Sequence, residues 1–403
     1  MSHSRKATPA RLLFVYTFFC IASNFVHPVT PALIQSLNFP SYMFGAAFSA
    51  MSLANFVFSP YWGYLSDRKG RRFTMLLGMA IYTIGQFAFS RATTIPGVLL
   101  ARALAGTGSA SYMAVSLAYL VDITNEENRG RYLAYLMAFQ SLSASVGYLI
   151  GGTLGDYNIM YSFVAQVVML VLGTLLAYMM IGESRSPEAM AVSLSDTQAK
   201  KFYDFKAMGK IMTLPVAFFL ISVCLATIGT QGYDNAFNYY IRDVFSFPPS
   251  YNGYIKAATG LVALVANFTL NLWIIRRFSP EKALLILLPI CAATLLLIPT
   301  MKTTGSFLAV CMIFYVFNAI YLPVQQAMMA QVRTANTGLL AGMFNAAKSA
   351  GNFVGPLAVG FLYDVGNKLP FYLAAFAFLL STGALLLRRP EHQTHAQKEE
   401  ISC

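Results

Sequence analysis

Asp234 is the one carboxylate that the sequence places in a segment apolar enough to lie within the hydrocarbon of a membrane. Burial disfavours the charged form of a carboxylate and a nearby cation favours it, so a carboxylate that alternates between two environments can load and release a proton. Lys256, in the next apolar segment, is the candidate cation. Asp234 is therefore a candidate for proton coupling; the alternative is that both side chains are simply hydrated at the membrane interface.

Two other ionisable side chains in apolar segments are candidates for the same chemistry. Arg102 is followed one helical turn later by Gly106, and a buried arginine needs a carboxylate, a cage of carbonyl groups or a water-filled cavity. The alternative for Arg102 is a side chain that extends to the outer interface. His27, which precedes Pro28, is of the residue type whose unperturbed pKa lies nearest to neutral pH, although a purely structural histidine also fits this position.

A second set of residues is suited to binding a molecule rather than to moving a proton. Aromatic rings, methionines and a few amides accept bulky amphipathic molecules without demanding one shape, whereas a sugar or an amino acid needs more polar partners. Lys348 can attract an anionic group of the substrate, pair with a carboxylate or extend toward the interface. The candidates for the substrate cavity are Asn24, Tyr112, Phe139, Tyr233, Phe237, Asn318, Gln325 and Lys348.

The composition indicates which elements carry these residues. Hydrophobic residues make up 57% of the chain and charged residues only 11%, whereas about 25% of the residues in soluble domains are charged. Twelve apolar segments are long enough to cross roughly 30 Å of hydrocarbon. We expect these spans at 12–37, 42–65, 73–89, 96–121, 132–154, 161–181, 211–240, 250–275, 283–301, 307–331, 337–363 and 370–387.

The net charge of +12 does not indicate a nucleic-acid partner, because the basic residues gather between the apolar segments rather than on one soluble face. Most of them fall on the side of the even-numbered connections and the termini, which places both termini in the cytoplasm. The five cysteines are scattered without a metal-ligand spacing, so we expect neither a metal site nor a disulfide framework.

Between the second and third segments lies a dense group of charges with the pattern Gly-x-Leu-x-Asp-Arg-x-Gly-Arg-Arg, at residues 63–72. Gly70 can supply the positive φ that a tight turn between two helices needs. These charges can form an inner gate with an acid and a base near the fourth and fifth segments; exposed pairs worth about 0–1 kcal/mol each are the alternative. The candidates for the gate are Gly63, Asp67, Arg68, Gly70, Arg71, Asp122 and Arg131.

The pattern at residues 63–72 resembles the signature loop between helices two and three of the major facilitator superfamily and matches it at every motif position. The Arg-x-x-x-Gly pattern at Arg102 is similar to the buried arginine of the antiporters in that superfamily. The fifth segment departs from the antiporter motif Gly-Pro-x-x-Gly-Gly, because Tyr148 stands where that Pro would be. This departure favours a packing role for the glycines that surround Tyr148.

The resemblance implies an all-α polytopic membrane protein with twelve transmembrane helices in two pseudo-symmetric halves of six. Residues 147–156 and 355–364 align without a gap, as expected of an internal repeat. We expect an N-terminal half at residues 1–181, a cytoplasmic linker at 182–210, a C-terminal half at 211–388 and a cytoplasmic tail at 389–403.

The chain is most similar to the drug:proton antiporter branch. This resemblance implies a secondary active transporter of the cell membrane that works by alternating access and exports hydrophobic or amphipathic small molecules in exchange for protons. The sequence has no phosphate-binding loop for ATP, and we expect no cofactor and a functional monomer in the lipid bilayer.

The alternative is a transporter of the same superfamily for a metabolite, a sugar or a lipid-linked substrate, or a uniporter without proton antiport. A membrane enzyme fits less well, because no acid/base pair or metal-ligand spacing lies at a common depth. A receptor would need a larger soluble module than the 14 residues from Pro390 to Cys403.

Overall fold

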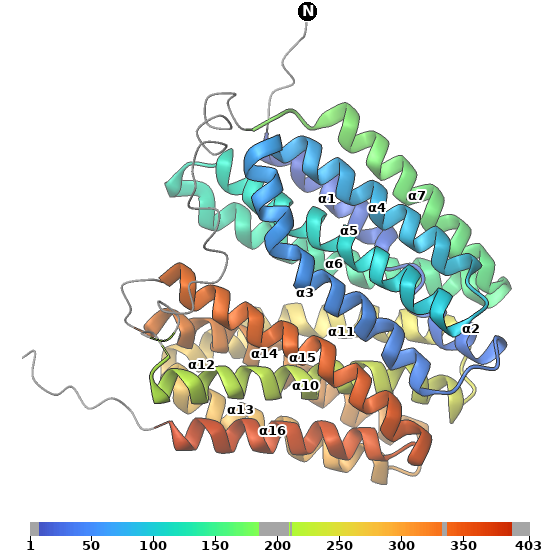
Figure 1. Cartoon of the computed structure of the whole chain (residues 1–403). Coiled ribbons are helices and arrows are strands. Elements are labelled where there is room, and N and C mark those ends of the chain that lie inside the picture. The colour runs from blue at the N-terminus through green and yellow to red at the C-terminus, as the bar shows by residue number, and fades with distance from the viewer. Residues whose placement is uncertain (1–7, 185–208, 210–211, 333–336, 389–403) are drawn as a thin grey trace, which may run out of the picture. The chain divides into compact units, whose positions relative to one another are not determined.

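The computed structural model describes residues 8–184, 209, 212–332 and 337–388, and the regular elements in this part of the chain are all helices (Figure 1). Most of the expected linker, at 185–208 and 210, the next residue, 211, and the expected tail at 389–403 lie outside the described residues. The elements are α1 (Pro9–Ser23), α2 (Thr30–Ser36), α3 (Tyr42–Lys69), α4 (Arg71–Arg91), α5 (Ile95–Asp122), α6 (Glu126–Tyr157), α7 (Ile159–Met180), α10 (Leu214–Asp243), α11 (Pro249–Ala266), the π-helical turn η2 (Asn267–Asn271), α12 (Leu272–Arg277), α13 (Pro280–Leu297), the 3₁₀ turn η3 (Ile298–Thr300), α14 (Thr304–Gln331), α15 (Thr337–Val365) and α16 (Leu369–Leu387).

Among the described residues, ten helices are long and apolar enough to cross a membrane. They are α3 to α7, α10, α11 continued through η2 into α12, α13 with η3, α14 and α16. The chain is therefore a multi-pass membrane protein. The first and eleventh expected spans correspond to the α1–α2 pair and to α15, and the full count of twelve stays a prediction.

The first expected span is not one continuous helix, which corrects the prediction of a single helix over residues 12–37. Turns separate α1 from α2, and Pro28, which has no amide hydrogen, lies in this break. The last carbonyls of α1 still find partners, because the Gln166 amide of α7 donates to Ala22 and Ser23 at 3.2 and 3.0 Å. The hydroxyl of Tyr82 also donates to Ser23. These hydrogen bonds satisfy the carbonyl groups that the break leaves without helical partners in the membrane region.

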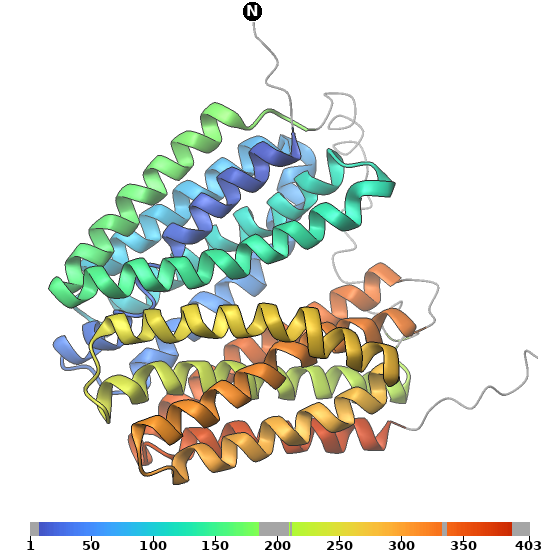
Figure 2. The same cartoon turned by 180° about the vertical axis from the view of Figure 1, so that it is seen from behind.

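Small residues allow the helices around α5 to approach one another closely. A Cβ at Gly78 of α4 would overlap Ser111 of α5, and a Cβ at Gly85 would overlap Ala105. Gly106 of α5 likewise faces the backbone of α3 at Met51. Contact through small residues is the usual way in which helices associate in lipid. Elsewhere in the first helices of the chain, α1 packs against both α6 and α7 (Figure 2).

The described helices group into two compact units. The first contains α1 to α7, the end of α10 from Gln231, α11 almost to its end and the part of α15 from Asn352. The second contains the beginning of α10, α12 to α14, the first part of α15 and α16. The residues described below belong to the first unit unless stated otherwise.

Candidate functional site

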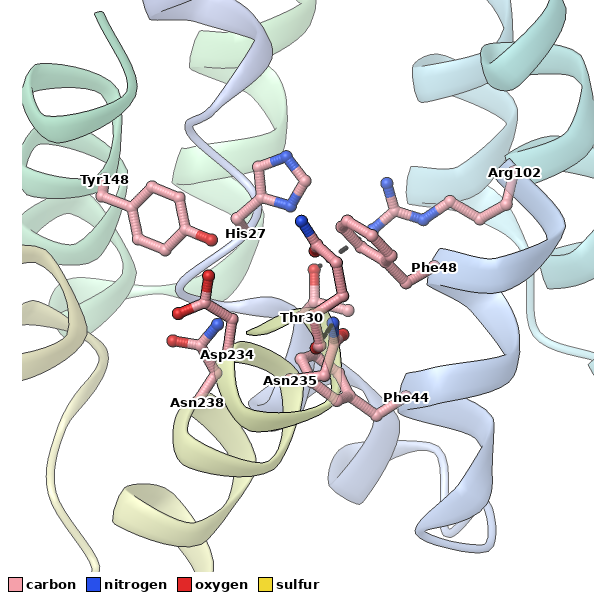
Figure 3. A pocket seen from close by; sticks show the side chains of 10 residues that line it. His27, Thr30, Phe44, Phe48, Arg102, Tyr148, Asp234, Asn235 and Asn238 are labelled. Atoms are coloured by element: carbon pink, nitrogen blue, oxygen red, sulfur yellow. Dashed lines mark hydrogen bonds between the residues drawn. The ribbon is translucent and has the colours of Figure 1, made fainter. Parts of the chain in front are cut away.

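A polar pocket lies within the first unit, and five elements contribute to its wall (Figure 3). The free space in and in front of it is about 440 Å³, a volume that includes open solvent. We call it the central pocket. Its lining residues are His27, Thr30, Phe44, Phe48, Arg102, Tyr148, Gln231, Asp234, Asn235 and Asn238. The three residues predicted to take part in proton coupling, His27, Arg102 and Asp234, therefore meet in one cavity although they are distant in sequence.

Asp234 forms an ion pair with Lys256, as the sequence predicts. The Lys256 ammonium of α11 lies 2.8 Å from Oδ1 of Asp234 on α10, and the two side chains are 19% and 25% exposed. Close contact of α6 and α11 positions Lys256, because Gly253 faces the backbone of Tyr148 and Ser145 donates to the Lys256 carbonyl at 3.2 Å. The ammonium also lies 5.9 Å from the centroid of the Tyr148 ring.

Arg102 is buried, with only 3% of its surface exposed, which does not fit the alternative of a side chain extending to the interface. Its guanidinium donates to the Thr30 hydroxyl at 3.3 Å and lies 3.8 Å from the centroid of the Phe89 ring. A further nitrogen contacts the sulfur of Met51 at 3.9 Å. The break between α1 and α2 makes this arrangement possible, because Thr30 begins α2 at the edge of the pocket.

His27 lies in the same break, and its ring stacks on Tyr148 with a centroid distance of 5.6 Å and an interplanar angle of 12°. Phe48 of α3 packs on it at 6.2 Å. Figure 3 shows the hydroxyl of Tyr148 directed toward Asp234. Tyr148 therefore lies between His27 and Asp234. A role of His27 in relaying a proton stays a prediction.

The predicted cavity residues lie in several places, and their role in binding stays a prediction. Asn24 donates to the Cys20 carbonyl at the end of α1, and Tyr112 packs between aromatic rings at 4.7 Å from Phe19. Phe139 is 37% exposed on α6. None of these three lines the central pocket as the structure describes it.

The predicted residues of α10 and of the second unit are likewise not among the residues that line the central pocket as described. Tyr233 and Phe237 of α10 are fully buried and pack on each other at 5.7 Å. Asn318, in the second unit, accepts a hydrogen bond from Thr230 at 2.9 Å. Gln325 is buried in the same unit, and the Lys348 ammonium lies 5.9 Å from the Phe344 ring.

Sequence reasoning missed much of the wall of the central pocket, although a signal was present. Gln231, Asp234, Asn235 and Asn238 recur at the spacing of one helical face within an apolar segment. A polar face in such a segment indicates a cavity rather than contact with lipid. Thr30, Phe44 and Phe48 carried no comparable signal, because only the fold brings them to the pocket.

The predicted gate residues Asp67, Arg71 and Asp122 come together at the junction of α3, α4 and α5. Arg71 is 7% exposed and bonds both acids, with its nitrogens 2.8 Å from Asp67 Oδ1 and 2.9 Å from Asp122 Oδ2. The Ser66 hydroxyl accepts a third bond at 2.6 Å. We call Asp67, Arg71 and Asp122 the charge cluster. Gly70 joins α3 to α4 with φ of 94°, which confirms the predicted positive φ.

Three predicted gate residues lie outside the charge cluster. The Arg68 guanidinium lies over the Tyr64 ring at 4.2 Å. Arg131 donates to the Tyr135 hydroxyl at 2.7 Å on the exposed surface of α6. Apart from the neighbouring backbone of its own helix, no atom of the described residues lies within 4 Å of the place where a Cβ of Gly63 would stand.

Glu183, which follows α7, is a member of this region that sequence reasoning did not identify. Its carboxylate accepts hydrogen bonds from the backbone amides of Arg71 at 2.9 Å and Arg72 at 3.1 Å. The first amides of a helix have no partner within the helix, so a carboxylate here satisfies two of them and interacts favourably with the helix dipole. The next residue, Ser184, donates to Asp122 at 3.1 Å.

Most of the chain is similar in sequence to a known protein family and to two bacterial proteins. The family model of the Major Facilitator Superfamily matches residues 12–331 and 303–402. Multidrug resistance protein 2 of Bacillus subtilis is 25% identical over 362 residues, which cover 89% of this chain and 90% of that protein. Multidrug resistance protein 1 of the same organism is 23% identical over 371 residues, covering 91% and 92%.

A solved structure shows the same fold at low sequence identity. The nucleoside transporter NupG superposes with a TM-score of 0.74 at 12% identity, covering 94% of this chain and 98% of that one. The superfamily is one of membrane transporters rather than enzymes. With the signature loop in place and the family model matched along almost its whole length, the chain belongs to the major facilitator superfamily.

Proposed function

We propose that this protein exports hydrophobic or amphipathic small molecules in exchange for protons. The observation that carries the proposal is the ion pair of Asp234 and Lys256 at the central pocket, because it joins a titratable carboxylate to a cavity that can hold cargo. The names of the two Bacillus subtilis relatives, both multidrug resistance proteins, support this class of cargo.

The charges that face Asp234 support proton exchange. Protonation of Asp234 removes its negative charge and breaks the ion pair, and loss of the proton restores that pair. The other ionisable groups that face the pocket are His27, Arg102 and Tyr148. A proton and the cationic part of a cargo molecule would compete for the same carboxylate, and such competition is the basis of exchange across a membrane.

The charge cluster would act as a latch in the alternating-access cycle. It fixes the loop between α3 and α4 to the end of α5, and Glu183 adds the residues that follow α7. The mechanism assumes two six-helix halves, at 1–181 and 211–388, in a monomer with both termini in the cytoplasm. The distribution of Lys and Arg between the apolar segments supports this orientation.

A transporter for a polar metabolite is the second candidate, and the amides of the pocket favour it. Gln231, Asn235 and Asn238 place donors and acceptors along one wall, as binding of a hydroxyl-rich molecule would require. A uniporter of this kind would move its cargo without moving protons.

Transport assays in proteoliposomes distinguish the two candidates. A pH-sensitive dye inside the vesicles reports proton movement while dansylcadaverine, xylose, uridine or glycerol phosphate is added. We expect flux coupled to the amphipathic amine in wild type, loss of that flux in Asp234→Asn, and normal flux in the matched control Asp243→Asn near the end of α10. Movement of a sugar or nucleoside without proton flux would overturn the proposal.

A further inference from the structure

Arg102 brings a positive charge to the central pocket, and none of the carboxylates in the described ranges forms an ion pair with it. It contacts the Thr30 hydroxyl, the Phe89 ring and the Met51 sulfur. Its Nε is buried and has no hydrogen-bond partner there. The guanidinium thus has five N–H groups but only neutral neighbours.

This arrangement is costly unless a ligand completes it. A buried charge without a counter-ion is among the least favourable features of a protein interior, and a buried donor without an acceptor adds to the cost. The contact of a desolvated cation with an aromatic face contributes about 2 kcal/mol. This is less than the penalty of several kcal/mol for burying an isolated ion. Asp234, the one carboxylate lining the pocket as described, is already bound to Lys256.

We propose that Arg102 binds the acid group of the cargo, so that the transported molecules are amphipathic compounds carrying a carboxylate or a similar anion. This inference rests on the proposed function, because it concerns the same pocket. Arginine is suited to the role, since its planar group binds a carboxylate through two parallel hydrogen bonds. Phe44 and Phe48 line the same pocket and would contact the apolar part of the molecule.

The position of Asp234 in the pocket adds a second requirement, a positive charge on the cargo. Arg102 and Asp234 enter the pocket from different helices and different sides (Figure 3). A purely anionic cargo would bind more tightly when Asp234 is protonated, because the pocket is then more positive, and it would move with protons. Exchange against protons instead requires a cargo cation that competes for Asp234. A zwitterionic amphiphile meets both requirements, because its anion would bind Arg102 and its cation would compete for Asp234.

Lys256 fits this interpretation as an internal stand-in for the cationic group. Its ammonium occupies the position beside Asp234 that a cargo ammonium would take, and its partly exposed side chain is long and flexible. Cargo binding would displace Lys256, and cargo release would let it return.

Three fluorescent probes that differ only in their charged groups test the proposal. Nε-dansyl-lysine is zwitterionic, dansylcadaverine is the same molecule without the carboxylate, and dansylaminohexanoate is the same molecule without the amine. Binding to the purified full-length protein is followed by dansyl fluorescence. We expect wild type to bind the zwitterion about tenfold or more tightly than dansylcadaverine, the effect of one charge-assisted bond.

Variants assign the effect to Arg102. We expect Arg102→Gln to lose the preference for the carboxylate, Arg102→Lys to keep part of it, and Arg91→Gln, an exposed arginine at the end of α4, to leave it unchanged. Elution volume and melting temperature establish folding, and Arg102→Lys, which keeps the charge but loses the planar pair of donors, is the second variant if Arg102→Gln does not fold. The preference for the carboxylate should then be weaker in Arg102→Lys than in wild type.

Equal binding of the zwitterion and dansylcadaverine by wild type would overturn the proposal, as would a preference for the carboxylate that survives Arg102→Gln or is undiminished in Arg102→Lys. Failure of this inference can be told apart from failure of the proposed function. If the carboxylate preference is present but cargo moves no protons in vesicles, the binding of the cargo acid by Arg102 stands and the proposed proton exchange fails. If proton exchange occurs with dansylcadaverine and no carboxylate preference is found, the proposed proton exchange stands and the binding of a cargo acid by Arg102 fails.

Discussion

The Glu183 carboxylate accepts a hydrogen bond from the backbone amide of Arg71, at 2.9 Å, across a sequence separation of 112 residues. This bond and its neighbour to Arg72 attach the residues that follow α7 to the beginning of α4. The same residue, Arg71, holds Asp67 and Asp122 with its side chain. One residue therefore joins four segments through its backbone and its guanidinium.

The first prediction concerns this helix cap. Glu183→Ala removes the acceptor of two amides at the beginning of α4, so the variant should lose about 1 kcal/mol of stability. The measurement is the melting temperature of the purified protein in detergent. Glu127→Ala, an exposed acid in the first turn of α6, is the matched control. If both variants melt at the same temperature, the cap does not stabilise the protein.

The second prediction concerns Gly70. Its φ of 94° and ψ of 151° lie in a region that only glycine adopts without strain, and a Cβ there would overlap the Glu183 carboxylate. Gly70→Ala should therefore cost about 1–3 kcal/mol. In the Glu183→Ala background the cost should be smaller, because the overlap is gone and only the strain remains. Strictly additive losses in the double variant would argue against contact between the two residues.

The third prediction concerns the charge cluster. Arg71→Gln leaves two neighbouring acids without this cation, so it should lower the melting temperature more than Asp67→Asn, because the Asp67 side chain is 41% exposed. Adding Asp122→Asn to Arg71→Gln should recover part of the loss, because an unpaired charge is removed. No recovery in the double variant would show that the acids do not depend on Arg71.

The fourth prediction concerns the ion pair of the central pocket. Lys256→Met leaves the half-buried Asp234 without its cation, and Asp234→Asn leaves Lys256 without its anion. Each single variant should be less stable than the combination of both, because breaking a pair costs more than removing it. Thermal unfolding of the three variants decides the point, and a double variant that is the least stable of the three would contradict it.

Some of these relationships follow from the sequence and others do not. The pairing of Asp234 with Lys256 was predictable, because both are rare charges in adjacent apolar segments. The positive φ of Gly70 was predictable from the tight connection between two helices. In contrast, the bond between Glu183 and the start of α4 joins distant segments, and no periodicity or motif signals a contact of that kind.

The break in the first span shows where sequence patterns fall short. Length and hydropathy predict one continuous helix at residues 12–37, but Pro28 and the Gln166 amide of α7 make a broken helix stable. This break places His27 and Thr30 at the central pocket. Hydropathy reports that a segment is buried in lipid, whereas the position of a break depends on which neighbouring side chains satisfy the freed carbonyls.

Proton release on binding shows whether cargo and a proton compete for Asp234. Purified protein in weakly buffered detergent solution is mixed with the tightest-binding probe of the dansyl series, and a pH-sensitive dye follows the medium. Over a series of decreasing pH values, which protonate Asp234 and open its pair with Lys256, we expect wild type and Asp243→Asn to release protons as cargo binds, whereas Asp234→Asn binds without release. Proton uptake on binding, or equal release by Asp234→Asn and wild type, would contradict this competition.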